Sequence, residues 1–102
     1  MYTVVMEGLT FTWDPTKAET NKNKHSVTFE EAQTVFYDEN ARLIYDPDHA
    51  ETEDRFILLG FSARLRLLVV SHTYRADETL IRIISARRAT RKEQRQYAEY
   101  LR

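Results

Sequence analysis

The sequence predicts one α+β domain, in which an antiparallel β-sheet carries two N-terminal helices and one C-terminal helix. Three observations predict this fold class. Two helix starts precede three strand-like segments, residues 55–61, 66–74 and 79–87. The joins between these segments are short enough for antiparallel hairpins. A third helix start follows them, and the 102 residues are enough for one core and too few for two.

The N-terminal part is predicted to contain one strand and two helices. Leu9–Trp13 alternates and is rich in aromatic and β-branched residues, as strands are. Asp14 as N-cap and Pro15 at the first helical position begin a mostly polar helix to about residue 23. Thr28-Phe29-Glu30-Glu31 matches a capping box. It begins a second helix with one apolar face, formed by Phe29, Ala32, Val35 and Phe36.

The C-terminal part is predicted to supply most of the sheet and the last helix. Residues 41–45 form a strand and residues 46–54 an acidic loop. Leu67-Leu68-Val69-Val70 is apolar on both faces, so this strand should be central. Thr90 and Glu93 form a second capping box, which begins a helix to about Leu101.

Composition excludes several classes of protein. Hydrophobic residues make up 42% and charged residues 30%, as in globular domains and unlike disordered chains. The chain has no cysteine, which excludes disulfides and thiolate metal sites. No apolar run is long enough to span a bilayer, and the first residues lack the basic start of a signal peptide. We expect a cytoplasmic protein.

The net charge of -1 conceals two halves of opposite charge. Residues 1–60 hold 5 Lys/Arg and 12 Asp/Glu, a balance of -7. Residues 61–102 hold 10 Lys/Arg and 4 Asp/Glu, a balance of +6. Such a basic half can attract polyanions. Alternatively, the two halves neutralise each other across the fold.

A Lys24-His25 pair lies in the turn between the two N-terminal helices. Histidine transfers protons near neutral pH, and an adjacent lysine can hold a phosphate, so the pair is a candidate acid–base site. The alternative is a histidine that caps the C-terminus of the first helix, where a cation is favoured. His72 lies inside a strand and is expected to be structural.

Arginines mark the strand ends, and their guanidinium forks suit phosphate. Arg55 and Arg75 should lie at the same edge of the sheet, because one begins a strand and the other ends its neighbour. Arg87 should lie at the opposite end unless the sheet curls. The alternative is that each arginine pairs with the acidic loop.

Two further clusters contain residues that could bind a ligand. Basic residues are concentrated at the start of the last helix: Arg87, Arg88, Arg91, Lys92 and Arg95. Their charges oppose the helix dipole there, which favours an anionic partner. The alternative is that they form a solvated face. The loop Asp46-x-Asp48-His49 with Glu51 and Glu53 has oxygen ligands for a hard cation but lacks the glycine-bearing spacing of a calcium loop. This indication of a metal site is therefore weak, and we expect no cofactor.

Four segments together resemble the BrnT toxins of BrnT/BrnA type II toxin–antitoxin modules. The resemblance runs from about Leu9 to Tyr97. Its motifs are Phe11-x-Trp13-Asp14-x-x-Lys17, Asn21-x-x-Lys24-His25-x-Val27-x-Phe29-Glu30-Glu31-Ala32-x-x-Val35-Phe36, Glu53-x-Arg55 and Arg82-Ile83-Ile84-Ser85-Ala86-Arg87-x-Ala89.

The resemblance implies a RelE-like ribonuclease fold and a cytoplasmic toxin that cleaves RNA without metal and inhibits translation. It also implies a BrnA antitoxin with a ribbon-helix-helix DNA-binding domain, which would form a hetero-oligomer with the toxin and bind operator DNA. The candidate catalytic residues are Lys24, His25, Arg55, Arg75 and Arg87; Lys17, Arg88 and Arg91 are candidate substrate-binding residues. A non-catalytic binding module that acts in transcriptional autorepression is the alternative.

The chain departs from the family pattern at two places. Ser26 stands where the family usually has glycine, so the turn after Lys24-His25 is expected to be held differently. The family pattern begins just before the Phe11 strand. Residues 1–102 are therefore expected to be a single toxin domain in which residues 1–8 are an N-terminal extension.

Overall fold

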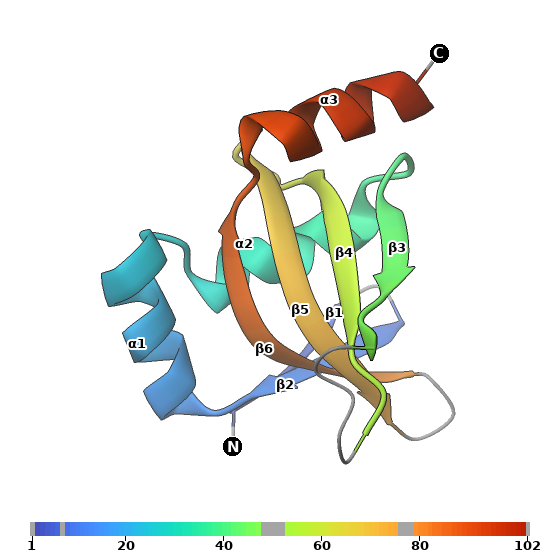
Figure 1. Cartoon of the computed structure of the whole chain (residues 1–102). Coiled ribbons are helices and arrows are strands. Elements are labelled where there is room, and N and C mark those ends of the chain that lie inside the picture. The colour runs from blue at the N-terminus through green and yellow to red at the C-terminus, as the bar shows by residue number, and fades with distance from the viewer. Residues whose placement is uncertain (1, 7, 48–52, 76–78, 102) are drawn as a thin grey trace.

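The computed structural model, which describes residues 2–6, 8–47, 53–75 and 79–101, forms a six-stranded sheet with helices on both faces (Figure 1). The strand order is β1-β2-β6-β5-β4-β3. The strands are β1 (Tyr2–Met6), β2 (Leu9–Trp13), β3 (Arg42–Tyr45), β4 (Phe56–Phe61), β5 (Leu67–Arg75) and β6 (Leu80–Arg88). The helices are α1 (Pro15–His25), α2 (Phe29–Thr34), the 3-10 turn η1 (Val35–Tyr37) and α3 (Arg91–Tyr100).

The sheet is mixed, which corrects the prediction of a purely antiparallel one. The pairs β3–β4, β4–β5 and β5–β6 are antiparallel as predicted. β2 runs parallel to β6, with Thr10 opposite Leu80. The parallel pair arises because α1, α2 and three strands lie between β2 and β6 in the chain, so no hairpin fixes their direction. β1 was not predicted; it pairs antiparallel with β2, Tyr2 opposite Trp13.

β5 is central, as its apolar sequence predicted, because it contributes to apolar clusters on both faces of the sheet. Leu68 and Val70 belong to the larger cluster, which β2 and α2 complete with Phe11 and Phe29. Val69 belongs to a smaller cluster under α3. The sheet is therefore covered by α2 on one face and by α3 across one end of the other (Figure 1).

α1 begins and ends at the residues that its sequence indicates. The Asp14 side chain accepts a hydrogen bond from the Thr16 backbone N–H, at 2.8 Å, and Pro15 occupies the first turn. Ser26 ends the helix in the left-handed region, with φ 58°, and its N–H donates to the Lys22 carbonyl at 2.9 Å. This conformation suits glycine better than serine, so the end of the helix carries a backbone cost at Ser26.

Ser26→Gly is expected to stabilise the protein by about 1 kcal/mol. The substitution removes the steric cost of a non-glycine residue in the left-handed region, about 1–2 kcal/mol. Part of this gain is offset because glycine makes the unfolded chain more flexible. The free energy of unfolding in urea measures the change. Ser26→Ala is the matched control: it keeps the steric cost of Cβ and should bring no gain. Equal stabilisation by both variants would contradict this explanation.

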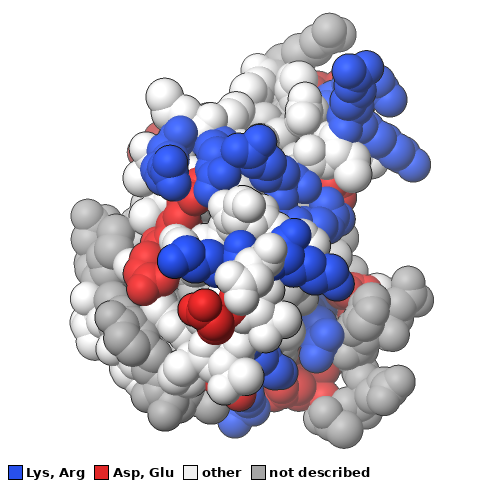
Figure 2. All heavy atoms as spheres, turned by 90° about the vertical axis from the view of Figure 1, so that its left-hand side faces the viewer, with Lys and Arg blue, Asp and Glu red and all other residues white. Residues whose placement is uncertain are grey.

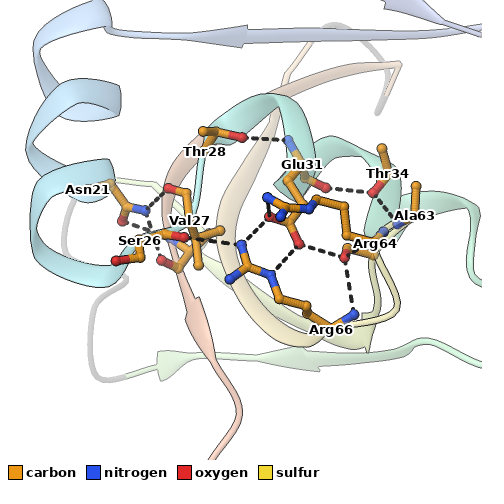
Figure 3. Close-up of polar contacts among 11 residues, drawn as sticks. Asn21, Ser26, Val27, Thr28, Glu31, Thr34, Ala63, Arg64 and Arg66 are labelled. Carbon is orange, nitrogen blue, oxygen red and sulfur yellow. Dashed lines mark hydrogen bonds and ion pairs between the residues drawn. The ribbon is translucent and has the colours of Figure 1, made fainter.

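α2 begins at Thr28, but the predicted capping box is only half formed, which corrects the sequence interpretation. The Thr28 hydroxyl accepts from the Glu31 N–H at 3.1 Å. The Glu31 carboxylate turns away from the helix start and accepts from Arg66 Nε, at 2.9 Å, and from the Ser62 hydroxyl, at 2.7 Å (Figure 3). A guanidinium in a partly buried place is a stronger donor than the neutral backbone N–H of an N-cap. Glu31 is therefore structural, through a buried ion pair.

His72 is structural, as predicted, but fully buried, with 0% exposure. Its ring packs edge-on against Phe36 and Tyr74, with centroid distances of 4.8 and 5.0 Å. Nδ1 lies 3.1 Å from the Val70 carbonyl oxygen, and Nε2 has no hydrogen-bond partner among the described residues. Burial lowers the pKa of His72 from 6.5 to about 4, so the ring is neutral in the folded state at neutral pH.

Stability is expected to fall as the pH drops from 6.5 toward 4, because over this range the unfolded chain protonates His72 and the folded chain does not. The loss should reach about 2 kcal/mol near pH 5 and about 3 kcal/mol near pH 4. Urea unfolding at pH 7 and pH 5 measures it. The control is His72→Leu. In this variant, the difference between the free energies of unfolding at pH 7 and at pH 5 should be about 2 kcal/mol smaller than in the wild-type chain. An unchanged difference would assign the acid sensitivity to other groups.

Candidate active site

α1 and β6 together form a hollow of about 260 Å³ that contains three of the predicted site residues. Lys17, Lys24 and His25 come from α1, and Ile84 and Ser85 from β6. Lys24 is exposed and His25 is half-buried, as the last residue of the helix. The last turn of a helix favours cations, so the capping alternative for His25 also agrees with the structure. The two roles do not exclude each other.

Asn21 holds α1 against β6. Its buried side-chain amide donates to the Ala86 carbonyl, at 2.8 Å, and to the Val27 carbonyl, at 3.0 Å. Its Oδ1 accepts from the Ala86 N–H at 3.0 Å (drawn in Figure 3 beside the Glu31 network). One side chain thus satisfies both backbone groups of Ala86, as a neighbouring strand would. This bond set, four residues before His25, fixes the position of the helix end relative to the sheet.

A second hollow, of about 230 Å³, brings Arg55 and Arg87 together. It is also lined by Ser71 and Ser85, which are Cα partners on β5 and β6. Arg55 is half-buried, and its Nε is buried without a hydrogen-bond partner among the described residues. The sequence placed Arg87 at the far end from Arg55 unless the sheet curls, and the shared hollow shows that these two arginines converge.

Arg87 is held by the start of α3. Its guanidinium donates to both carboxylate oxygens of Glu93, at 2.8 and 3.0 Å. The Thr90–Glu93 capping box is complete, as predicted, so the same carboxylate also accepts from the Thr90 N–H. The hydrogen bonds from Arg87 lower the pKa of Glu93 to about 2, and Glu93 in turn raises the pKa of Arg87. Arg87 is therefore a fixed cation at the rim of the hollow.

The other predicted residues lie outside these two hollows. Arg75 ends β5 and pairs with Glu53 of the acidic loop, at 2.9 Å, on the exposed surface. This is the pairing that the alternative interpretation of the arginines predicted. Arg88 lines a third hollow, of about 230 Å³, with Arg66 and Gln94. Arg91 is exposed at the first position of α3.

The face of the molecule that carries α1 is basic. Figure 2 shows Lys and Arg side chains spread over this face from its middle to its upper part, with few acidic side chains among them. Asp46 is the one carboxylate among the described residues that line the two hollows. This distribution favours an anionic ligand.

Residues 48–52 of the acidic loop, including Asp48, His49 and Glu51, lie outside the described residues. Within the described part of the chain, no group of three or more His, Cys, Asp or Glu side chains could hold a metal ion. None of the described helices is both long and apolar enough to cross a membrane.

The family model described as "Ribonuclease toxin, BrnT, of type II toxin-antitoxin system" matches residues 13–93. The chain belongs to the BrnT family. Membership implies an RNA target and an antitoxin partner for this BrnT toxin. The matched range begins after β1 and most of β2 and ends inside α3. It includes every predicted site residue.

One solved structure supports the fold of this BrnT chain. The 1.1 Å crystal structure of the Brucella abortus ribonuclease toxin BrnT has a TM-score of 0.59 and 23% sequence identity. The match covers 79% of this chain and 96% of the Brucella chain. No curated protein matches the chain. The α+β architecture with a mixed sheet and three helices is therefore that of a BrnT toxin.

Three polar residues that line the second hollow were not among the predicted site residues: Asp46, Ser71 and Ser85. The alternation of β6 contained a usable indication, since Ser85 and Arg87 are two residues apart and point to one face of the strand. For Asn21, the sequence contained no indication beyond its place in the family motif. A single side-chain amide that bonds to a distant strand leaves no periodic pattern.

Proposed function

We propose that this BrnT chain is a metal-independent endoribonuclease with a RelE-like fold, which cleaves RNA in the cytoplasm and thereby inhibits translation. The observation that carries the proposal is the pair of adjoining hollows: one has Lys24 and His25, the other has Arg55 and Arg87, and they meet on β6. Imidazole supplies proton transfer, and guanidinium and ammonium groups supply charge stabilisation. These are the groups that RNA cleavage without a metal requires.

The proposed reaction is an in-line transesterification. The ribose 2′-oxygen forms a bond to phosphorus, the bond from phosphorus to the 5′-oxygen breaks, and a 2′,3′-cyclic phosphate results. The 2′-hydroxyl loses one proton and the 5′-oxygen gains one, and His25 exchanges a proton at one of these atoms. Lys24 orients the phosphate, Arg55 and Arg87 stabilise the charge that develops on it, and Lys17, Arg88 and Arg91 bind the flanking backbone. Arg75, at the same edge of the sheet as Arg55, assists only if RNA displaces its Glu53 partner.

The test of metal independence uses purified protein and a defined RNA oligonucleotide. Cleavage should proceed at the same rate in EDTA as in Mg²⁺, and the product should end in a 2′,3′-cyclic phosphate. Loss of cleavage in chelator that returns with Mg²⁺ or Mn²⁺ would instead assign the chemistry to the acidic loop. A 2′-O-methyl oligonucleotide of the same sequence is the matched control and should stay intact.

The proposed partner is a BrnA-type antitoxin with a ribbon-helix-helix domain, in a hetero-oligomer that binds its own operator DNA. Growth arrest on expression of the toxin, relieved by the gene next to it, tests this part. The alternative is a non-catalytic binding module, and the carboxylate partners that Arg75 and Arg87 already have favour it. RNA or antitoxin binding with no cleavage and no growth arrest would establish that alternative.

A further inference from the structure

The two hollows of the candidate active site are joined at a single described residue, Ser85. It lines the α1 hollow together with Lys24 and His25, and it lines the arginine hollow together with Arg55 and Arg87. A ligand that extends from one hollow into the other would therefore lie next to Ser85. The two hollows, of about 260 and 230 Å³, lie on either side of it.

A β-bulge presents Ser85 at this point. Ser71 on β5 is the Cα partner of Ser85, and the next pair is His72 with Ile83, so the register shifts and Ile84 has no partner. A bulge adds local twist and changes the direction of the neighbouring side chains. Here the extra residue places Ile84 and Ser85 together at the wall of the α1 hollow. Beyond it, the Asn21 amide takes over the pairing at Ala86.

A second hydroxyl, that of Ser71, lies opposite Ser85 in the sheet and lines the arginine hollow with it. Ser71 and Ser85 are directly opposite each other on an antiparallel pair, and both are half-buried. Side chains in such a pair have their Cβ atoms about 5 Å apart. Among the described residues, neither hydroxyl has a hydrogen-bond partner. A serine is small enough to leave the passage open, and its O–H can donate to an anionic oxygen.

We infer that Ser85, assisted by Ser71, forms a subsite for one phosphodiester group of bound RNA, at the crossing between the two hollows. The Ser85 hydroxyl donates to a non-bridging phosphate oxygen, and the nucleosides on either side lie in the α1 hollow and the arginine hollow. Ser85 binds and positions the backbone and exchanges no proton. This inference rests on the proposed function for its substrate class, RNA.

Binding of a non-cleavable ligand tests the subsite separately from catalysis. A short 2′-O-methyl RNA is titrated into the whole chain, and backbone amide NMR shifts and affinity are recorded. The amides of Ser71, Ile84 and Ser85 should shift. Ser85→Ala should weaken binding about tenfold, because it removes one hydrogen bond to a charged group. Ser85→Leu should weaken it further by closing the passage. Thr3→Leu, a hydroxyl-to-leucine exchange on the exposed face of β1, is the matched control and should bind normally.

The outcomes separate the two proposals. Binding that shifts these amides and is lost in Ser85→Leu supports the subsite, even if unmodified RNA is never cut and the ribonuclease proposal fails. Shifts confined to other residues, full affinity in both Ser85 variants, or no binding of the wild-type chain would overturn the subsite. Cleavage at the wild-type rate by a folded Ser85→Leu variant would overturn it while leaving the ribonuclease proposal intact.

Discussion

His25→Ala is expected to reduce the rate of RNA cleavage by about 10²–10⁴-fold while leaving the chain folded. The size follows from the proposed role, because positioned proton transfer to or from a reacting oxygen contributes that much. The fold should persist, since His25 is half-buried at the end of α1 and Asn21, which fixes that end, is unchanged. Single-turnover cleavage of a defined oligonucleotide measures the rate, and thermal unfolding checks the fold.

Asn23→Ala is the matched control for His25→Ala. Asn23 is an exposed residue of the same helix turn, and it lines neither of the two hollows. Its replacement should change the cleavage rate less than twofold. A His25→Ala variant that cuts RNA as fast as Asn23→Ala would remove His25 from the mechanism and leave only the capping role at the helix end.

Arg66→Ala is expected to destabilise the protein by about 3–5 kcal/mol, because it leaves a buried carboxylate without its counter-charge. Glu31 is 6% exposed, and Arg66 bonds both of its oxygens (Figure 3). The same guanidinium donates to the Ser26 carbonyl at 3.1 Å, so it also ties the turn after His25 to the residue that precedes β5. The hydrogen bonds from Arg66 lower the pKa of Glu31. This part of the stability is present above pH 4.5 and is lost as the pH falls through the lowered pKa.

Two variants show whether the buried charge causes this loss. Arg64 comes from the same turn as Arg66, but it is 73% exposed and lies 3.9 Å from Glu31. Arg64→Ala should therefore cost less than about 1 kcal/mol. The double variant Glu31→Gln/Arg66→Ala should be more stable than Arg66→Ala alone, since it removes the unpaired charge. Urea unfolding measures all three free energies, and a double variant no more stable than Arg66→Ala would contradict the explanation.

Local chemistry made most of the elements predictable. Three features were predicted from residues that are close together in the chain, and each is found where the sequence placed it. They are the helix start at Asp14-Pro15, the capping box of Thr90 and Glu93, and the strand around Leu68 that is apolar on both faces. The prediction of a purely antiparallel sheet was wrong at the β2–β6 pair, and the capping box predicted at Thr28–Glu31 is only half formed. Both depend on partners far away in the chain, which a local pattern does not contain.

The candidate site was predictable in its residue types and not in its arrangement. Lys24 and His25 share a hollow because they are neighbours on one helix end. The convergence of Arg55 with Arg87 depends on the shape of the whole sheet, and the pairing of Arg75 with Glu53 depends on where one loop folds. Strand spacing alone gives neither of these.

The attachment of α1 to β6 through Asn21 has a thermodynamic consequence. Asn21 is the one buried residue of α1, and Ala18 is its one apolar side chain packed against the main core. Few contacts thus oppose the detachment of this helix, and sub-global opening of α1 should require less free energy than unfolding of the sheet. The half of the candidate site that holds His25 should therefore open at a lower free energy than the half that holds Arg87, which lies on β6.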